Sequence, residues 1–124
     1  MRMKITEIKD TYLKDYLLAV NAMKPAGPLK LKTCAACISG DGPKRLREES
    51  RRILIESTLG AVVGIANKYR GACLSFTKLI EEGNRGLIYA VDTYNEKQGD
   101  FFAYVLWHAE SAIIDSVVAC RKGL

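Results

Sequence analysis

Apolar side chains along this chain recur at helical spacing, and the alternation typical of β-strands is almost absent. The first stripe follows an i, i+1, i+4, i+5, i+8 pattern and consists of Tyr12, Leu13, Tyr16, Leu17 and Val20. It predicts a helix that ends before Pro25, because a loop rich in proline and glycine begins there. A short second helix is expected over residues 29–39, with inward side chains Leu31, Ala35 and Ile38.

A third helix is expected to begin near Pro43, since proline suits the first turn of a helix. Its first part carries a basic cluster, interleaved with Glu48 and Glu49, that consists of Lys44, Arg45, Arg47, Arg51 and Arg52. Its later part is apolar, and the predicted inward face consists of Ile55, Leu59, Val62, Ala66 and Tyr69. Gly60 and Gly64 in this part favour a close approach by a neighbouring helix.

Ser75 suits the N-cap of a fourth helix, because its hydroxyl can accept a hydrogen bond from an N–H of the first turn. The predicted inward face of that helix consists of Phe76, Leu79, Ile80, Gly83, Leu87, Val91 and Tyr94. The side chains expected to point to solvent are Lys78, Glu81, Glu82 and Arg85. A polar turn over residues 95–100 leads to a last helix over about residues 101–121.

The last helix carries two apolar faces, which is typical of a helix that is sandwiched or has a partner. The broader face, expected to be the core side, consists of Phe102, Val105, Leu106, Ala109, Ile113, Val117 and Cys120. The second arc consists of Tyr104, Trp107, Ile114 and Val118. Together the helices predict an all-α fold, a compact bundle of about four to five helices. We expect one domain over residues 1–124, with an upstream helical element over 12–42 and the remaining helices over 43–124.

The composition is that of a globular domain, with 124 residues, 48% of them hydrophobic and 27% charged. No apolar run reaches the roughly 20 residues that a membrane helix needs. No apolar segment follows the basic start at residues 1–4, so a secretory signal is not indicated. We therefore expect a cytoplasmic domain without a membrane partner.

The net charge of +5 is unevenly distributed along the chain. Residues 1–70 hold 14 Lys and Arg against 7 Asp and Glu, whereas residues 71–124 hold 5 against 7. A basic surface favours a polyanionic partner such as nucleic acid. The basic cluster of the third helix is therefore either a phosphate-contacting surface or an ordinary solvated helix face.

Four cysteines and one histidine offer little chemistry of their own. Cys34 and Cys37 form a CxxC pair, but Cys73 and Cys120 are isolated and His108 is the only histidine. A zinc site needs a second pair or two spaced histidines, so no metal site is predicted. The cysteines are expected to be reduced, small buried apolar residues. No nucleophile–base arrangement is recognisable, so neither an enzyme nor a cofactor is indicated.

Residues 75–94 resemble the core-polymerase-binding helix of bacterial sigma-70-family transcription initiation factors. The most specific piece is the run Leu79-Ile80-x-Glu82-Gly83-Asn84-x-Gly86-Leu87. Three more segments resemble the same family in the same order, at residues 35–41, 59–69 and 101–107. The resemblance extends over about residues 12–119 and implies the all-helical central domain of a sigma factor.

This resemblance implies two binding surfaces. The fourth helix would contact the clamp coiled coil of core RNA polymerase through Leu79, Ile80, Glu81, Glu82, Asn84, Gly86 and Leu87. The last helix would engage the single-stranded, non-template −10 promoter element, because extruded bases stack on aromatic rings. The DNA-binding candidates there are Phe101, Tyr104, Trp107, His108 and Ser111, and core packing is the alternative role for their rings. The domain would act in the cytoplasm, at the nucleoid.

Departures from the family pattern keep two functions open. Glu110, Ile114 and Asp115 stand where family members carry DNA-contacting side chains, and the two carboxylates would repel phosphates. Lys78 replaces a common Asp in the polymerase-binding helix, and Arg85 replaces an apolar residue. The chain is therefore either a sigma-like initiation factor or a sigma-derived protein-interaction module that does not read DNA. Expected further partners are a sigma regulator, a second copy, or a separate chain that supplies the remaining promoter-binding domain.

Overall fold

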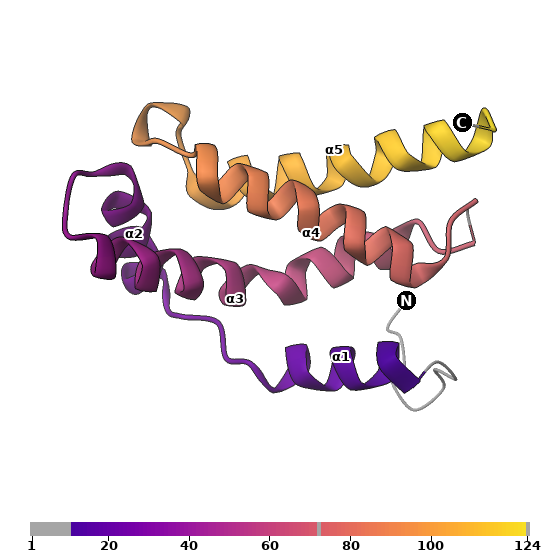
Figure 1. Ribbon diagram of the computed structural model, residues 1–124, viewed down its shortest axis with the longest axis horizontal. Helices are drawn as coiled ribbons and strands as arrows, with labels where there is room; N and C mark the ends of the chain where they lie inside the picture. The colour runs from indigo at the N-terminus through magenta and orange to yellow at the C-terminus, as the bar shows by residue number, and fades with distance from the viewer. Residues whose placement is uncertain (1–10, 72, 124) are drawn as a thin grey trace.

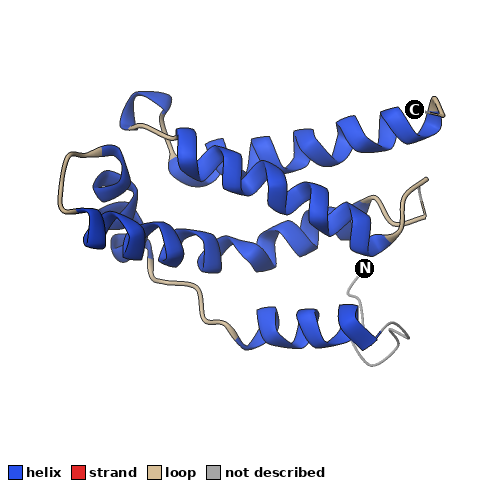
Figure 2. Ribbon diagram, in the orientation of Figure 1, coloured by secondary structure: helices blue, strands red, loops and turns tan. Residues whose placement is uncertain are grey.

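The computed structural model describes residues 11–71 and 73–123, and every regular element in them is a helix (Figure 2). The elements are α1 (Thr11–Ala22), α2 (Pro28–Ser39), α3 (Lys44–Lys68), α4 (Phe76–Thr93), the 3₁₀-helix η2 (Glu96–Gln98) and α5 (Phe101–Arg121). The predicted all-α fold of about four to five helices is confirmed. The predicted extent of the domain and the basic start of the chain involve residues 1–10, 72 and 124, which lie outside the described residues.

Helices α3, α4 and α5 run side by side through the length of the molecule (Figure 1). The α4–α5 pair makes the most extensive contact between elements, and α4 also packs on α3. Helix α2 packs on α3 near its start, and α1 lies along the other end of α3, away from α5 (Figure 1). Because α3 and α5 run in the same direction, the loop after α3 and the end of α5 lie at the same end of the molecule.

The helix ends follow the local signals in the sequence. Helix α1 ends at Ala22, before Pro25, as predicted. The Ser75 hydroxyl accepts a hydrogen bond from the Lys78 N–H at 3.2 Å, which confirms the predicted N-cap of α4. Helix α5 is capped by Asp100, whose carboxylate accepts a hydrogen bond from the Ala103 N–H at 2.9 Å. These caps satisfy donors that a helix cannot satisfy internally.

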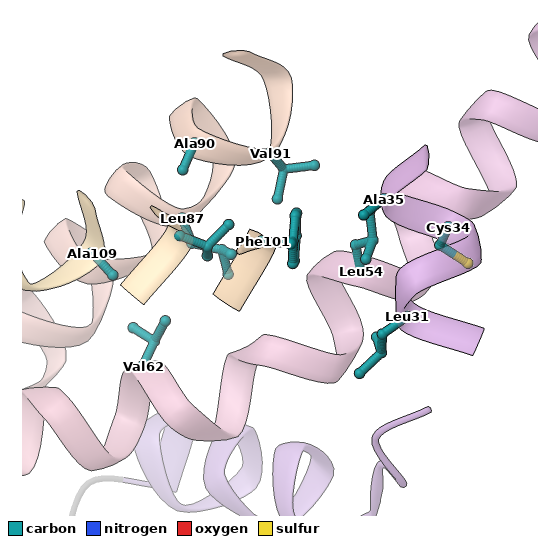
Figure 3. Close-up of a cluster of buried hydrophobic side chains, with 11 residues drawn as sticks. Leu31, Cys34, Ala35, Leu54, Val62, Leu87, Ala90, Val91, Phe101 and Ala109 are labelled. Atoms are coloured by element: carbon teal, nitrogen blue, oxygen red, sulfur yellow. The ribbon is translucent and has the colours of Figure 1, made fainter. Parts of the chain in front are cut away.

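Two hydrophobic clusters fill the two ends of the bundle. The first, drawn in Figure 3, joins α2 to α3, α4 and α5 and consists of Leu31, Cys34, Ala35, Leu54, Val62, Leu87, Ala90, Val91, Phe101, Val105 and Ala109. The second joins α1 to α3, α4 and α5 and consists of Leu17, Ala66, Leu79, Ile80, Ile113 and Val117. Helices α3, α4 and α5 contribute to both clusters, so they form one continuous scaffold.

The buried face of α3 is rotated from the predicted one. The residues that it buries recur at every fourth position and are Ser50, Leu54, Thr58, Val62 and Ala66. Ile55 and Leu59, predicted to point inward, are only half-buried. Thr58 can take a core position because its hydroxyl donates to the carbonyl of Leu54 at 2.9 Å, which satisfies the buried polar group. A pattern of apolar residues alone could not anticipate this threonine.

The close helix contacts also lie elsewhere than predicted. A Cβ added to Gly64 would meet nothing within 4 Å, and one added to Gly60 would meet only the Val20 side chain at 3.8 Å. By contrast, a Cβ on Gly86 would lie 2.5 Å from the His108 carbonyl oxygen, and one on Gly83 would lie 2.6 Å from a Val62 methyl. The two glycines of α4, rather than those of α3, therefore allow close helix packing.

Helix α5 has two apolar faces, as predicted, but their members differ from the prediction. Phe102, Leu106 and Cys120 of the predicted core face and Tyr104 of the second arc are half-buried. Its inner row packs against α3 and α4 and consists of Phe101, Val105, Ala109, Ile113 and Val117. Its outer row lies in solvent and consists of Trp107, Ile114 and Val118. In the part of the chain that the structure describes, α5 is the one helix long and apolar enough to cross a bilayer. Its inner row is nevertheless occupied by contacts within the domain, as in any core helix.

Candidate functional site

The outer row of α5 begins with the most exposed large aromatic side chain of this helix. The side chain of Trp107 is 66% exposed, and Ile114 and Val118 extend the apolar surface toward the end of the helix. Ser111 lies between them in helical register and is half-buried. An exposed tryptophan beside further exposed apolar groups is typical of a binding surface.

A cluster of four rings surrounds the start of this outer row. The His108 ring lies at the centre, with ring centroids 4.6 Å from Tyr104, 5.0 Å from Trp107 and 5.2 Å from Tyr89. All three contacts are edge-to-face, the geometry that aromatic quadrupoles favour. We call these four residues the aromatic cluster; it spans the junction between α4 and α5.

Tyr104 is held in place by the end of α4 and by η2. Its hydroxyl lies 2.8 Å from the Thr93 hydroxyl and accepts a hydrogen bond from the Gln98 amide at 3.3 Å. Its ring also packs against Tyr94, with centroids 5.6 Å apart. Tyr104 therefore acts as a rigid wall of the aromatic cluster, whereas the more exposed ring of Trp107 offers a free face.

Phe101 does not belong to the exposed surface. It is buried in the first hydrophobic cluster (Figure 3). Its ring also meets the Tyr94 ring edge-to-face, with centroids 5.2 Å apart. As the first residue of α5 it packs into the cluster that joins α2 to α4, so its ring is buried in this fold. Phe101 therefore has the core position given above as its alternative role, and its contact with DNA stays an untested prediction.

Tyr89 is the member of the aromatic cluster that the sequence pattern did not single out. It lies on α4, the helix for which the family resemblance implied only polymerase contacts. Its side chain is 57% exposed. A usable signal was present, because Tyr89 falls outside the predicted inward face of its helix. Its contact with His108 on α5 depends on how the two helices pack, which the sequence does not indicate.

Most of the residues expected to contact polymerase lie inside the bundle. The buried members of that set are Leu79, Ile80, Glu82, Gly86 and Leu87. Their burial follows from α4 being the central helix, packed on both α3 and α5. In this fold their side chains pack inside the bundle, and their contact with polymerase stays a prediction. Only Glu81 of that set is exposed.

Asn84, the remaining member, connects α4 to α1. Its side-chain amide donates to the Tyr16 hydroxyl at 2.9 Å. Its Oδ1 atom is buried and accepts no hydrogen bond from any described residue. The Asn84 edge of α4 is therefore covered by α1, whereas the Tyr89 edge of the same helix meets α5.

Glu82 was expected in solvent but is buried against three partners. Its Oε1 atom lies 3.1 Å from the Lys78 ammonium and 3.7 Å from the Arg85 guanidinium. Burial would raise the pKa of Glu82, but hydrogen bonds with Lys78 and Ser116, together with the positive charges of Arg85 and Lys78, outweigh it and lower that pKa below its usual value. The carboxylate thus stays charged and is neutralised within the chain, so Lys78 and Arg85 do not add two unpaired charges.

Glu110 turns toward α3 instead of toward solvent. Its Oε2 atom accepts a hydrogen bond from the Tyr69 hydroxyl at 2.6 Å and pairs with the Lys68 ammonium at 2.9 Å. These two donors lower the pKa of Glu110. The predicted repulsion between Glu110 and phosphates is therefore weakened, because the carboxylate is already paired.

The strongest ion pair of the basic cluster is internal. Arg51 donates from two nitrogens to the two carboxylate oxygens of Asp92, at 2.6 and 3.1 Å. Such a bidentate pair is stronger and more specific than a single contact. It ties the first half of α3 to the end of α4, so Arg51 has a structural role in this fold.

The rest of the basic cluster is also largely engaged. Lys44 and Arg52 each pair with the glutamate four residues further along α3, at 3.8 and 2.9 Å. Arg47 donates from Nε to the carbonyl oxygen of Gly42 at 3.0 Å. Among the described residues, Arg45 is the member without an ion pair or side-chain hydrogen bond. This pattern favours a solvated helix face over a phosphate-contacting surface.

The expectation that all cysteines are reduced is wrong for one pair. Cys73 and Cys120 form a disulfide, with Cα atoms 5.9 Å apart, although 47 residues separate them in sequence. They meet because the loop after α3 and the last turn of α5 lie at the same end of the bundle (Figure 1). Cys34 is a free, buried core residue, as predicted, and Cys37 is free and half-buried. No group of three metal-ligating side chains occurs in residues 11–71 and 73–123.

A comparison with known families covers the helices that carry these surfaces. The family described as Sigma-70 region 2 matches residues 54–122, which is more than half of the chain. This chain belongs to the sigma-70 region 2 family. The family membership predicted from the Leu79–Leu87 run is thereby confirmed, and the matched part contains α4, α5 and the second half of α3.

Two curated relatives of this region 2 domain share the same segment. The RNA polymerase sigma factor SigA of a Bacillus species is 41% identical over 71 residues, which are 56% of this chain and 19% of that protein. SigA of Lactococcus lactis subsp. cremoris is 38% identical over 71 residues, which are 56% of this chain and 20% of that protein. The matched segment thus spans about a fifth of the length of these relatives.

Proposed function

We propose that this region 2 domain acts in transcription initiation, in the cytoplasm at the nucleoid. It binds core RNA polymerase through the solvent face of α4 and holds unpaired bases of the −10 promoter element on the aromatic cluster. The observation that carries the DNA part is the exposed ring of Trp107, supported from behind by His108. A flat, solvent-facing ring on a rigid helix can stack on an extruded base.

The charges around the aromatic cluster support this proposal. The carboxylate of Glu110 is engaged by Lys68 and Tyr69 on α3, so it does not face the outer row as a free charge. Asp115 stays exposed, which makes stacking, rather than phosphate pairing, the main contribution on α5. The basic cluster is excluded from the proposal because most of its members are paired within α3 or with α4.

The polymerase contact is assigned to the exposed part of α4. Glu81 is the exposed member of the set implied by the family, and Ile88 lies two turns further along the same face, 41% exposed. The buried members of that set support this face from inside by fixing the position of α4. The proposed contact is therefore smaller than the sequence pattern implied and is centred on Glu81 and Ile88.

Single-strand binding tests the DNA part directly. Trp107 is the only tryptophan of the chain, so its fluorescence reports on its own stacking. A single-stranded oligonucleotide with a −10 element should quench that fluorescence, and a duplex of the same sequence should quench it less. Trp107→Ala should weaken binding of a fluorescein-labelled strand by roughly tenfold or more, measured by anisotropy. Ile114→Ala is the matched control on the same outer row.

Retention of the domain by immobilised core RNA polymerase tests the protein part. Glu81→Arg should lower retention several-fold, because reversing a charge at an interface removes charge complementarity with the partner. Glu49→Arg, an equivalent reversal at an exposed site on α3, should leave retention unchanged. Equal retention of both variants would refute the assigned face, and no retention of the unaltered domain would refute polymerase binding altogether.

The exposed outer row supports a second candidate function. Ile114 and Val118 continue the Trp107 surface over three turns of α5, beyond the reach of the aromatic cluster. A surface of this kind also suits a sigma-derived protein-interaction module. Core binding without any single-strand binding would favour this function over the first.

A further inference from the structure

We propose that Tyr89 and Arg85 extend the single-strand site from α5 onto α4, and together hold one further nucleotide. This inference rests on the proposed function and concerns residues outside the helix assigned to DNA. Tyr89 would stack on the base, and Arg85 would pair with the adjoining phosphate. The site would then cross the α4–α5 junction instead of following α5 alone.

The accessibility of the rings is the first argument. Tyr104 is immobilised by hydrogen bonds with Thr93 and Gln98, and it is half-buried. Tyr89 has more than half of its side chain in solvent, as Trp107 has, and both rings contact His108 edge-to-face. The accessible π-faces of the aromatic cluster therefore belong to Trp107 and Tyr89, on different helices.

The position of Arg85 is the second argument. It precedes Tyr89 by four residues on α4, so the two side chains are neighbours on the helix surface. Its side chain is 75% exposed, and its ion pair with Glu82 is long, at 3.7 Å. Because Lys78 pairs with the same Glu82 oxygen at 3.1 Å, that carboxylate keeps a partner when Arg85 turns to a phosphate. A ring and a guanidinium one helical turn apart match the base and phosphate of one nucleotide.

The two edges of α4 have different neighbours within the bundle. Tyr89 lies on the edge that meets α5, through His108. Asn84 lies on the opposite edge, where its amide donates to Tyr16 of α1. Arg85 follows Glu81 by four residues, so the strand site borders the proposed polymerase contact on this side of α4.

Anisotropy titrations with the full chain and a fluorescein-labelled oligo(dA) of about ten nucleotides test the inference. Tyr89→Ala should weaken binding by roughly tenfold, whereas Tyr89→Phe, which keeps the ring, should bind like the unaltered chain. Tyr12→Ala is the matched control, because Tyr12 is 91% exposed and lies on α1. Circular dichroism melting curves should be unchanged in all three variants, since the altered side chains are exposed.

The salt dependence tests Arg85 separately. Arg85→Gln should reduce the slope of log affinity against log salt concentration by about 0.7, the value for one phosphate contact on a single strand. Arg45→Gln, an unpaired arginine on α3, should leave the slope unchanged. An unchanged slope for Arg85→Gln, or the same reduction in both variants, would overturn the role of Arg85.

The outcomes also separate this inference from the proposed function. If Trp107→Ala abolishes binding and Tyr89→Ala does not change it, the inference is wrong and the proposed function stands. If Tyr89→Phe loses affinity as Tyr89→Ala does, ring stacking at Tyr89 is wrong. If the unaltered chain does not bind the strand at all, the proposed DNA function itself fails.

Discussion

The two faces of α5 carry similar apolar side chains but have different surroundings. Its inner row is buried against α3 and α4, whereas its outer row lies in solvent. The neighbouring isoleucines illustrate the contrast, because Ile113 is fully buried and Ile114 is 41% exposed. The difference shows that hydrophobicity marks both a core and a binding surface, and that only the packing of neighbouring helices distinguishes them.

The packing that distinguishes the two faces depends on the glycines of α4. Gly86 lies against the backbone of α5 at His108 and Ala109, and Gly83 lies against the Ile113 side chain. Without side chains at these positions, α4 can approach the inner row closely. The outer row has no such neighbour among the described residues and remains free for a partner.

Truncating the two isoleucines should give the largest contrast. Ile113→Ala should lower the free energy of unfolding by about 2–5 kcal/mol, because it leaves a cavity in the second hydrophobic cluster. Ile114→Ala should change it by about 0.5 kcal/mol or less, because that side chain is exposed. Urea unfolding followed by circular dichroism measures both values. Similar losses at the two positions would contradict the assignment of inner and outer rows.

Opening the disulfide near the end of α5 should give the next largest loss of stability. Cys120→Ser should lower the free energy of unfolding by about 2–4 kcal/mol, because the Cys73–Cys120 bond restricts the unfolded chain over 47 residues. Reduction of the unaltered chain should give a loss of similar size. Cys37→Ser, at a free cysteine, is the control, and it should respond to reduction as the unaltered chain does.

Replacing a glycine by alanine should change the stability of the domain in opposite directions at two positions. Gly86→Ala should destabilise the domain by about 1–3 kcal/mol, because the new Cβ would meet backbone atoms of α5 that cannot move aside. Gly64→Ala should stabilise it by up to about 1 kcal/mol, because its Cβ meets nothing and alanine favours the helix. Thermal melting of both variants decides this, and a stabilising Gly86→Ala would refute the close α4–α5 contact.

The smallest expected effect is on how the free energy of unfolding changes at acidic pH. The pKa of Glu110 is lowered from its usual 4.5 by the Tyr69 hydroxyl and the Lys68 ammonium. The folded state thus binds this proton less readily than the unfolded state, so its contribution is present above about pH 4.5 and lost as pH falls through the lowered pKa. Glu110→Gln should cost about 1 kcal/mol or less at pH 7 and nothing at pH 2, measured by urea unfolding at both. An equal loss of unfolding free energy at pH 7 and pH 2 would indicate that Glu110 contributes through packing and not through its charge.

Much of the fold could be predicted because its signals are local. Proline at position 25 and the hydroxyl of Ser75 act within a few residues of the helix ends that they define. The amphipathic face of α4 was recognisable for the same reason, since helical spacing places its buried residues on one side. Family membership also followed from a contiguous run of residues in α4.

The remaining features depend on contacts between distant segments. Glu82 is buried because Ser116 and the cations on α4 satisfy it, and Arg51 is neutralised by a carboxylate 41 residues away. The disulfide and the contact of Tyr89 with His108 likewise join parts of the chain that are remote in sequence. Charge counts and helical periodicity carry no information about such pairings, so the candidate site was the least predictable part.

The disulfide has a mechanical consequence. The bond between Cys73 and Cys120 closes a covalent ring that contains α4 and α5, the two helices assigned to polymerase and DNA. Tension applied between Thr11 and Lys122 passes from residue 73 to residue 120 through the two sulfur atoms. Helices α1, α2 and α3 therefore extend under load, whereas the backbone inside the ring carries no tension until the bond is reduced. In a force-extension experiment, the gain in contour length on unfolding should accordingly be smaller in oxidising than in reducing buffer.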